Sequence, residues 1–316
     1  MHRSFHVLPL AAAMLLTCGD GTAGPNGGDW ASGTPLPEPL QEMHAAVLGG
    51  NIYVAGGFDL TSQATARAFR YEPAADRWVR IADLPAPRHH MPVAVAADSL
   101  YAIGGYGPTG FAPVATLWVY DASGDRWLSR ASLPAPRGAS AAAGVGGRIV
   151  VVGGVGPGGT LVQATAIYDP GTNAWSAGAS IPTPRDHLAA ASLEGALYVV
   201  GGRPQNPDNN FAVLERYDIT ADTWATLAPM PTARGGLAAG VLSNRLHALG
   251  GETSSRVFRE HEAYDPATDT WTALAHLPTP RHGLGVAVVG GRLYAIGGGP
   301  RAGFAQTAEV EIYSPD

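Results

Sequence analysis

Hydrophobic and polar positions along the chain predict short strands separated by frequent turns. Apolar runs such as 149–152 and 197–200 are rich in the β-branched and aromatic residues that favour strands. Glycine, proline, asparagine and aspartate interrupt such runs about every ten residues, as expected for an all-β protein. So many turn formers exclude a helical bundle and predict an all-β fold.

One unit of about 48 residues recurs six times. Its first marker is a tryptophan, found at Trp30, Trp78, Trp127, Trp175, Trp224 and Trp271. A Gly-Gly pair begins 26 residues after each tryptophan, at Gly56, Gly104, Gly153, Gly201, Gly250 and Gly297. A tyrosine then precedes the next tryptophan by seven residues, at Tyr71, Tyr120, Tyr168, Tyr217 and Tyr264, and Tyr313 ends the series. Only the segment between the glycines and the tyrosine varies in length, which predicts a variable loop there.

Each unit predicts four strands: a tryptophan strand, a strand of small residues after a proline-rich loop such as 84–88, a strand ending in Gly-Gly, and a tyrosine strand. Four strands per unit are typical of a propeller blade. The strands rich in alanine and glycine, such as 139–144 and 236–240, are expected to lie innermost, because blades converge toward the axis. The tryptophan strand is then outermost.

The recurring Gly-Gly pair, a Tyr-Asp-Pro segment such as 168–170, and the following tryptophan resemble the Kelch β-propeller family over residues 30–316. The resemblance implies one six-bladed propeller of the galactose oxidase/kelch-like superfamily, similar in size to the six-bladed sialic acid mutarotases. It also implies that the paired glycines let a neighbouring aromatic ring pack close, and that the tryptophans and tyrosines are structural. Because the last unit ends at Tyr313 without a tryptophan strand, the Trp30 strand is expected to complete the last blade and close the ring.

The N-terminal residues predict export. Residues 1–17 have the charged and apolar parts of a signal peptide. Cys18 follows as a candidate lipidation site, and 18–29 reads as a lipid-anchored or flexible tether. Cleavage near Ala23 and a buried structural cysteine are the alternatives. A periplasmic or cell-surface lipoprotein, or otherwise a secreted protein, is therefore expected, without an intrachain disulfide because Cys18 is the only cysteine.

Composition excludes several function classes. All 20 basic residues are arginines, so lysine Schiff-base, pyridoxal and phosphate-loop chemistry is excluded. A formal net charge of −6 without a basic run argues against nucleic acid as a partner. A copper oxidase like galactose oxidase is excluded as well, because it requires a cysteine crosslinked to a tyrosine and the only cysteine lies in the leader.

The proline-rich and variable loops are expected to share one face, here called the loop face. An arginine stands ten residues after each tryptophan except the first, where Leu40 replaces it: Arg88, Arg137, Arg185, Arg234 and Arg281. The resemblance implies that these arginines face the channel and contact an acidic ligand, for which a guanidinium offers paired donors. The alternative is structural: each arginine satisfies carbonyl groups of its own and neighbouring loops.

Departures from the repeat are more informative about function. Two residues after the arginine position the units read Glu42, His90, Ala139, His187, Gly236 and Gly283, and one residue after it they include His89, Asp186 and His282. The histidines match no metal motif and belong to blades expected to lie far apart, so exposed polar residues are favoured and no metal or cofactor is predicted. On the variable loops, Arg203, Asn210 and Arg256 join His90, His187 and the five arginines as ligand-binding candidates.

These observations favour an exported module that binds a ligand or a protein through the loop face around the channel, with a protein or an acidic carbohydrate as partner. The alternative is a sugar-modifying enzyme such as a sialic acid epimerase or mutarotase. Such an enzyme needs a proton-transferring group, for which Glu42, Asp186, His187 and Glu252 are all candidates. The sequence singles out no catalytic residue among them.

Overall fold

The computed structural model describes residues 27–316. The predicted signal peptide, Cys18 and the tether up to residue 26 lie outside the described residues. Within 27–316, apart from the short 3-10 turn η1 (Pro157–Gly159), all regular structure is β-strand. In the same range there is no helix with the length and apolar character needed to cross a membrane.

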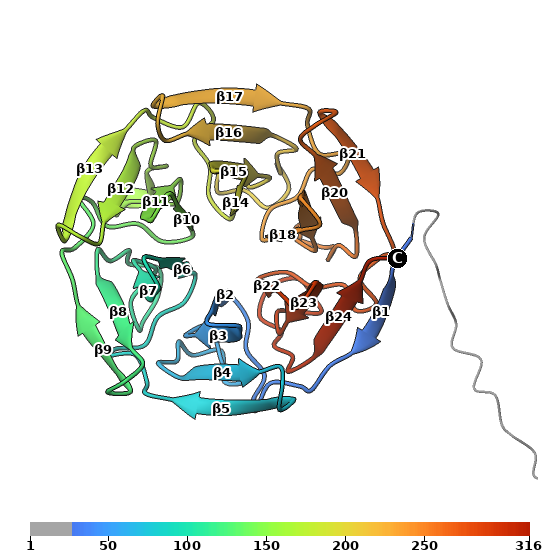
Figure 1. Cartoon of the computed structure of the whole chain (residues 1–316), viewed down its shortest axis with the longest axis horizontal. Coiled ribbons are helices and arrows are strands. Elements are labelled where there is room, and N and C mark those ends of the chain that lie inside the picture. Colours follow the sequence, from blue (N-terminus) through green and yellow to red (C-terminus); the bar gives the residue numbers. More distant parts are fainter. Residues whose placement is uncertain (1–26) are drawn as a thin grey trace, which may run out of the picture.

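The strands of the described chain form six four-stranded antiparallel sheets around a central axis (Figure 1). Blade 1 contains β2 (His44–Leu48), β3 (Asn51–Ala55), β4 (Ala68–Glu72) and β5 (Arg77–Ile81). Blade 2 contains β6 (Val93–Ala96), β7 (Ser99–Ile103), β8 (Leu117–Asp121) and β9 (Arg126–Ser129). Blade 3 contains β10 (Ala141–Val145), β11 (Arg148–Val152), β12 (Thr165–Asp169) and β13 (Ala174–Gly178).

Blade 4 contains β14 (Ala189–Leu193), β15 (Ala196–Val200), β16 (Leu214–Asp218) and β17 (Thr223–Leu227). Blade 5 contains β18 (Ala238–Leu242), β19 (Arg245–Leu249), β20 (His261–Asp265) and β21 (Thr270–Ala273). Blade 6 contains β22 (Gly285–Val289), β23 (Arg292–Ile296), β24 (Val310–Ser314) and, from the other end of the chain, β1 (Asp29–Ser32). The predicted six-bladed propeller is confirmed.

Strand β1 supplies the outer strand of blade 6, so both ends of the described chain meet in one sheet (Figure 1). Trp30 lies opposite Tyr313 in the antiparallel register, and its indole Nε1 donates a hydrogen bond of 2.9 Å to the carbonyl of Ala275 in blade 5. Closure of this kind pairs the edge that β24 would otherwise expose.

The innermost strands β2, β6, β10, β14, β18 and β22 line the central channel, as the small residues predict (Figure 1). Neighbouring inner strands approach so closely that a Cβ on Gly144 would lie 1.9 Å from the carbonyl oxygen of Val95. Larger residues would push the blades apart, so the taper of the propeller depends on glycine and alanine here.

The tryptophans and tyrosines join neighbouring blades at their outer strands. In one example, Trp127 Nε1 donates to the carbonyl of Ala82 at 2.9 Å, and the hydroxyl of Tyr120 donates to Asp125 at 2.7 Å. The same Asp125 oxygen accepts the backbone N–H of Ala82 at 2.8 Å. Trp30, Trp78, Trp175, Trp224 and Trp271 donate to neighbouring blades in the same way. These aromatic residues are therefore structural.

The Gly-Gly pairs do not make room for an aromatic ring, contrary to what the family resemblance implies. Gly201 and Gly202 have φ angles of 63° and 99°, a left-handed region that favours glycine. A Cβ on Gly201 would lie 2.5 Å from the carbonyl oxygen of Arg234, the arginine of the next blade. The glycines thus let the proline-rich loop of the following blade approach the strand end.

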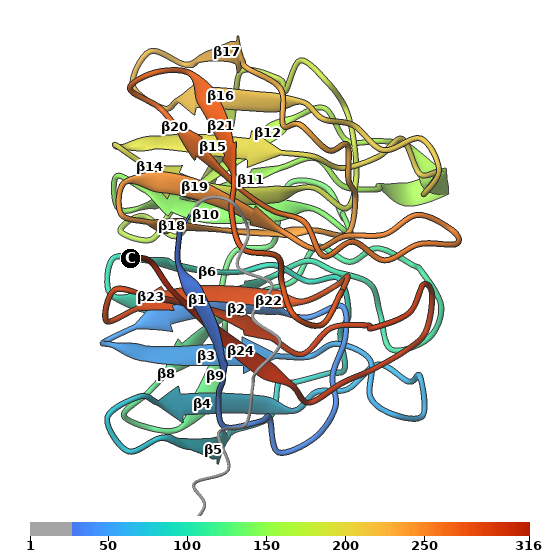
Figure 2. The same cartoon turned by 90° about the vertical axis from the view of Figure 1, so that its right-hand side faces the viewer.

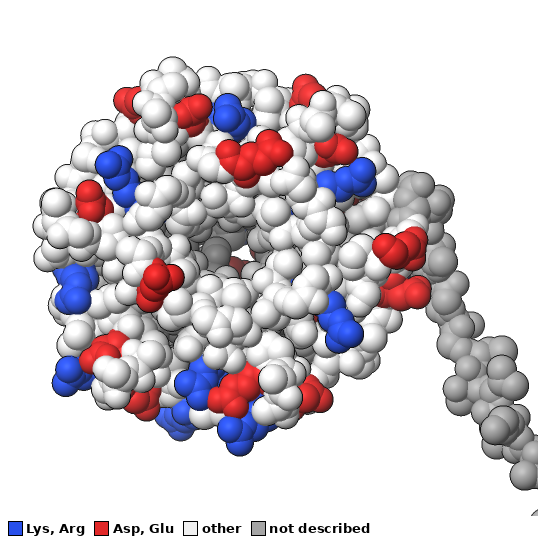
Figure 3. Space-filling model, in the orientation of Figure 1, with Lys and Arg blue, Asp and Glu red and all other residues white. Residues whose placement is uncertain are grey.

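The two faces of the propeller differ. Short turns lie on one side and the longer loops on the other, as predicted (Figure 2). On the face with the short turns, the opening of the channel is surrounded by uncharged residues (Figure 3). A cavity of about 340 Å³ there is lined by alanine, valine, glycine and Ser192 of the inner strands. Ionisable side chains at the axis therefore belong to the loop face.

Candidate functional site

The arginine repeated in each blade is buried inside that blade. Arg185, Arg234 and Arg281 have an exposed fraction of 0%. The Arg185 guanidinium donates to the carbonyls of Gly201 at 2.6 Å and Val199 at 3.1 Å, and it pairs with Glu215 on β16. Arg234 and Arg281 pair in the same way with Glu262 and Glu311, at 2.6 Å each.

The first three blades fill the equivalent space differently. Arg88 lies over the ring of Trp118 at 4.8 Å, and Arg137 donates to the carbonyl of Ala164 at 2.9 Å. Leu40 packs in one apolar cluster with Phe69, which occupies the strand position of Glu215. The expectation that five arginines ring the channel mouth is corrected: the side chains turn into their own blades, where each donates to backbone carbonyls and all but Arg137 also meet a carboxylate or an aromatic ring. The alternative given above, in which each arginine has a structural role inside its blade, therefore describes these residues.

The loops before the inner strands converge in a closed hydrogen-bonded ring at the axis. Its members, here called the central ring, are Glu42, His90, Ala139, His187, Gly236 and Gly283, with φ angles from 50° to 67°. The N–H of each donates to the carbonyl of the preceding member at 2.7–3.1 Å, and Glu42 donates to Gly283 to close the circle. Every backbone N–H of the central ring is therefore satisfied by the neighbouring blade.

The central ring brings together side chains that the sequence interpretation placed far apart. The imidazole centroids of His90 and His187 are 4.9 Å apart, although these residues belong to blades 2 and 4. Ala139 of blade 3 lies between them in the ring and leaves them room. The inference that the histidines are too distant to act together is therefore wrong, because these loops reach the axis, where the spacing between blades is smallest.

Glu42 is the acidic centre of this cluster. Its Oε2 lies 3.2 Å from His90 Nε2, and its Oε1 lies 3.2 Å from His282 Nδ1. Burial alone would raise the pKa of Glu42, but His90 and His282 hold it well below its usual range. Burial alone would lower the pKa of His282, but the hydrogen bond to Glu42 and the charges of Glu42 and Glu252 raise it. Glu42 is therefore an ionised carboxylate at neutral pH.

Arg203 and Asn210 lie beside this cluster. Arg203 Nη1 donates to Glu252 Oε1 at 3.1 Å, and its Nε is 3.6 Å from Asp186 Oδ1. Asn210 Nδ2 donates to the backbone carbonyl of Glu252 at 2.7 Å. Arg203 thus pairs with two carboxylates, whereas Asn210 holds the backbone of Glu252.

Arg256 lies apart from the cluster. Its side chain is 58% exposed, pairs with Glu260, and lies over the Phe258 ring at 4.5 Å. These contacts hold it on its own variable loop. The structure therefore does not bring Arg256 together with the other candidates.

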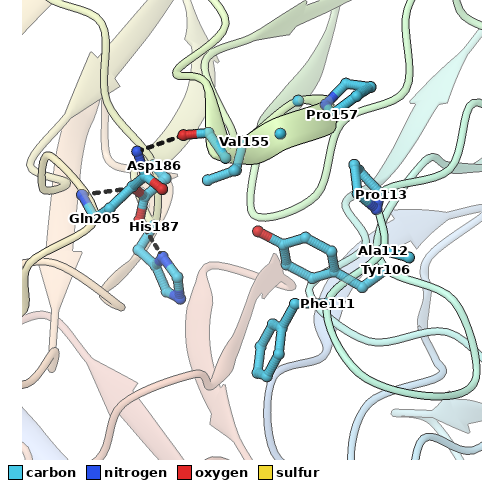
Figure 4. A pocket seen from close by; sticks show the side chains of 12 residues that line it. Tyr106, Phe111, Ala112, Pro113, Val155, Pro157, Asp186, His187 and Gln205 are labelled. Carbon is cyan, nitrogen blue, oxygen red and sulfur yellow. Dashed lines mark hydrogen bonds and ion pairs between the residues drawn. The ribbon is translucent and has the colours of Figure 1, made fainter.

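A pocket of about 670 Å³ opens beside the central ring, between the loops of blades 2, 3 and 4. Tyr106 and Phe111 lie on one side, and Asp186, His187 and Gln205 lie on the other (Figure 4). The remaining wall is the loop of Val155 and the glycines around Pro157. The pocket therefore combines two aromatic rings with ionisable and amide groups.

Within this pocket, Asp186 fixes the orientation of His187. Asp186 Oδ1 bonds to His187 Nδ1, and its Oδ2 accepts the backbone N–H of Gln205 at 2.8 Å. With Nδ1 engaged, Nε2 is the imidazole nitrogen through which His187 can act on a ligand.

Tyr106 and Phe111 are the pocket residues that the sequence interpretation missed. The residue after each Gly-Gly pair is Phe58, Tyr106, Val155, Arg203, Glu252 or Gly299. These residues form bridges with the residues that follow the arginine position, such as His89 with Tyr106 and Asp186 with Arg203. Comparing this position across the six units would have identified Tyr106, whereas nothing in the repeat marks Phe111.

The fold and the position of the cluster define the class of protein: a kelch-type six-bladed β-propeller whose ionisable side chains gather where the loops meet the axis. The family model of the Attractin/LZTR1 beta-propeller matches residues 52–299. The chain belongs to this family.

Comparison with solved structures supports the fold. The structure titled "Structure of YjhT" superposes with a TM-score of 0.77 at 16% sequence identity, covering 89% of this chain and 97% of that chain. At this identity the likeness concerns the fold alone. No curated protein sequence matches the chain.

Proposed function

We propose that the protein is an exported binding module that holds a small polyhydroxylated ligand, such as a sugar, in the loop-face pocket. The pocket itself supports this most strongly: a volume of about 670 Å³ lies within the range of small-molecule sites. Export rests on the signal-like residues 1–17.

The walls of the pocket suit a sugar. Tyr106 and Phe111 offer aromatic faces for C–H groups, and Phe111 is 57% exposed at the opening. Asp186, His187 and Gln205 supply acceptors and donors for hydroxyl groups on the opposite side. A ligand with an apolar face and a polar rim matches this arrangement.

The charges favour a neutral ligand over the acidic carbohydrate expected from the sequence. Arg203, which lies beside the pocket residue Asp186, is engaged by Glu252 and Asp186. The repeated arginines are buried in their blades, so none of them offers a guanidinium to the carboxylate of a ligand in the pocket. Asp186 and Glu42 would repel an anion instead, as long as no cation is bound beside them.

A binding screen tests this proposal. Saturation-transfer NMR or calorimetry with a panel of neutral hexoses, amino sugars and sialic acid would be compared for the unmodified protein, Phe111→Ala, His187→Gln and the control Arg256→Ala. We expect a neutral sugar to bind, and Phe111→Ala and His187→Gln to weaken its binding at least tenfold, while Arg256→Ala leaves it unchanged. Absence of any sugar binding, or equal binding by all variants, would contradict the proposal.

One observation favours the alternative of a sugar mutarotase or epimerase. Asp186 holds His187 Nδ1, an arrangement that leaves Nε2 as a general base or acid at the pocket wall. NMR exchange measurements at the anomeric centre of the bound sugar would test this. Acceleration lost in His187→Gln would support catalysis, whereas tight binding without acceleration would support a binding module.

A further inference from the structure

Glu42, His90 and His187 bring metal-binding atoms from three blades to one side of the central ring. One donor atom from each lies within 4.8 Å of the others, and His90 Nε2 is 3.2 Å from Glu42 Oε2. Two imidazoles and one carboxylate form a donor set that zinc and similar divalent ions take in proteins, with one coordination position left for water or a ligand.

The hydrogen bonds behind His90 determine which of its nitrogens carries a proton. His89 Nε2 lies 3.0 Å from the carbonyl oxygen of Gly110, so this nitrogen donates. His89 Nδ1 is then the acceptor for His90 Nδ1, which lies 2.6 Å away and must donate. In neutral His90 the lone pair is therefore on Nε2, directed at the ionised Glu42 Oε2. His90 Nε2 and Glu42 Oε2 lie 3.2 Å apart, so a proton or a metal ion shared by the two atoms would satisfy both of them.

A hydrogen bond also determines which nitrogen of His187 is free to bind a metal. Its Nδ1 is bonded to Asp186, which leaves Nε2 as the ligating atom. Metal-binding histidines usually donate the opposite N–H to a carboxylate or to another acceptor, and this orients the ring. Asp186 is this partner for His187, and His89 is this partner for His90.

A small cavity is lined by Glu42, His90 and His187. It has a volume of about 20 Å³, which is room for one water-sized species. Ser140 also lines it, and the Ser140 hydroxyl is buried without a hydrogen-bond partner among the described residues. A buried hydroxyl without a partner indicates that a polar species belongs in the cavity.

We propose that Glu42 Oε2, His90 Nε2 and His187 Nε2 bind one divalent first-row transition-metal ion. His282 holds Glu42 Oε1 on the far side of the carboxylate. Since His187 also lines the loop-face pocket, the ion lies at the wall of that pocket. The proposal goes beyond sugar binding and is tested without any sugar. With the ion bound, His187 Nε2 is a ligand and no longer a free base, so metal binding and the mutarotase role of this atom exclude each other.

The test begins with the full protein, stripped with a chelator and titrated with Zn²⁺ and Co²⁺. We expect one ion per chain, a rise in melting temperature with Zn²⁺, and visible absorption of bound Co²⁺ typical of a four- or five-coordinate ion. Failure of both ions to bind at one per chain would overturn the proposal.

Variants then locate the ion. His187→Gln and Glu42→Gln should each weaken Zn²⁺ binding by about 100-fold or more, and Asp186→Asn, which changes only the orienting partner, by about 10- to 100-fold. His276→Gln is the matched control, because His276 is an exposed histidine away from the ring. Zn²⁺ affinity that is equal in His187→Gln and His276→Gln would place the ion elsewhere and overturn the assignment. Because His187 is partly exposed, its variant is expected to fold even if Glu42→Gln does not.

Discussion

The repeated arginine and the central ring lie only two residues apart in the sequence, yet they serve opposite purposes. The arginine position is nearly the same in every blade, and its side chain is buried among carbonyls of that blade. The ring position has the same left-handed backbone conformation in every blade but different side chains, from glycine to glutamate and histidine. A feature repeated in each blade belongs to the blade. A feature that varies on a constant backbone is where a specific site can arise.

Removing the closing strand should have the largest effect on stability. Deletion of residues 25–36 removes β1, exposes the edge of β24 and deletes the Trp30 indole packed against Tyr313 and His261. We expect a loss of at least about 4 kcal/mol in the free energy of unfolding, comparable with removal of a packed tryptophan. Thermal unfolding measures it, and an unchanged melting temperature would show that β1 is dispensable.

Breaking one buried ion pair should come next. Glu215→Ala leaves the Arg185 guanidinium buried without its carboxylate, so we expect a loss of about 3–5 kcal/mol. The chain itself offers the control, because blade 1 fills the equivalent positions with Leu40 and Phe69. The double variant Arg185→Leu/Glu215→Phe should recover most of the loss in urea unfolding. If the double variant recovers none of the lost free energy of unfolding, Arg185 has a role beyond filling space and making hydrogen bonds inside its own blade.

Acid should destabilise the scaffold through a buried histidine pair in blade 5. His247 Nδ1 and His261 Nε2 are 2.8 Å apart. Arg245 acts on His247 through its charge. The rings of Trp30 and Tyr313 pack against His261, and the charges of Arg234 and His276 act on it from further away. Burial lowers the pKa of His247 to about 4 and that of His261 well below its usual range.

The unfolded chain therefore binds protons more readily than the folded one below about pH 6.5, and stability falls as the pH drops from there toward 4. The fall should reach about 3 kcal/mol for His247. Chemical unfolding at pH 7 and pH 4 measures it. His247→Gln should flatten this dependence, and an unchanged slope in that variant would assign the acid sensitivity to other groups.

The substitution of His187 in the central ring should have the smallest effect on stability. His187 is partly exposed and contributes to the ring through its backbone, so His187→Gln should change the free energy of unfolding by less than about 1 kcal/mol. Thermal unfolding checks this. A loss as large as that of Glu215→Ala would make His187 part of the scaffold.

The sequence was sufficient to predict the fold because the repeat fixes it: six units, four strands each, small inner strands and an outer strand borrowed by the last blade. The role of the arginines could not be decided, because it depends on what stands about 30 residues later on another strand: Glu215, Trp118 or Phe69. The proximity of His90 and His187 was missed because sequence spacing carries no information about the radius at which the loops meet. Phe111 could not be predicted, since it lies on a loop outside the repeat.

The central claim is that binding depends on the residues that break the repeat and not on the repeated ones. Calorimetric titration of the best-binding sugar of the panel into His187→Gln and into Arg185→Leu/Glu215→Phe tests it most directly. We expect metal-free His187→Gln to keep the melting temperature of the metal-free unmodified protein and to bind the sugar at least tenfold more weakly, and the double variant to bind the sugar like the unmodified protein. Loss of binding in the double variant, with full binding in His187→Gln, would contradict this account.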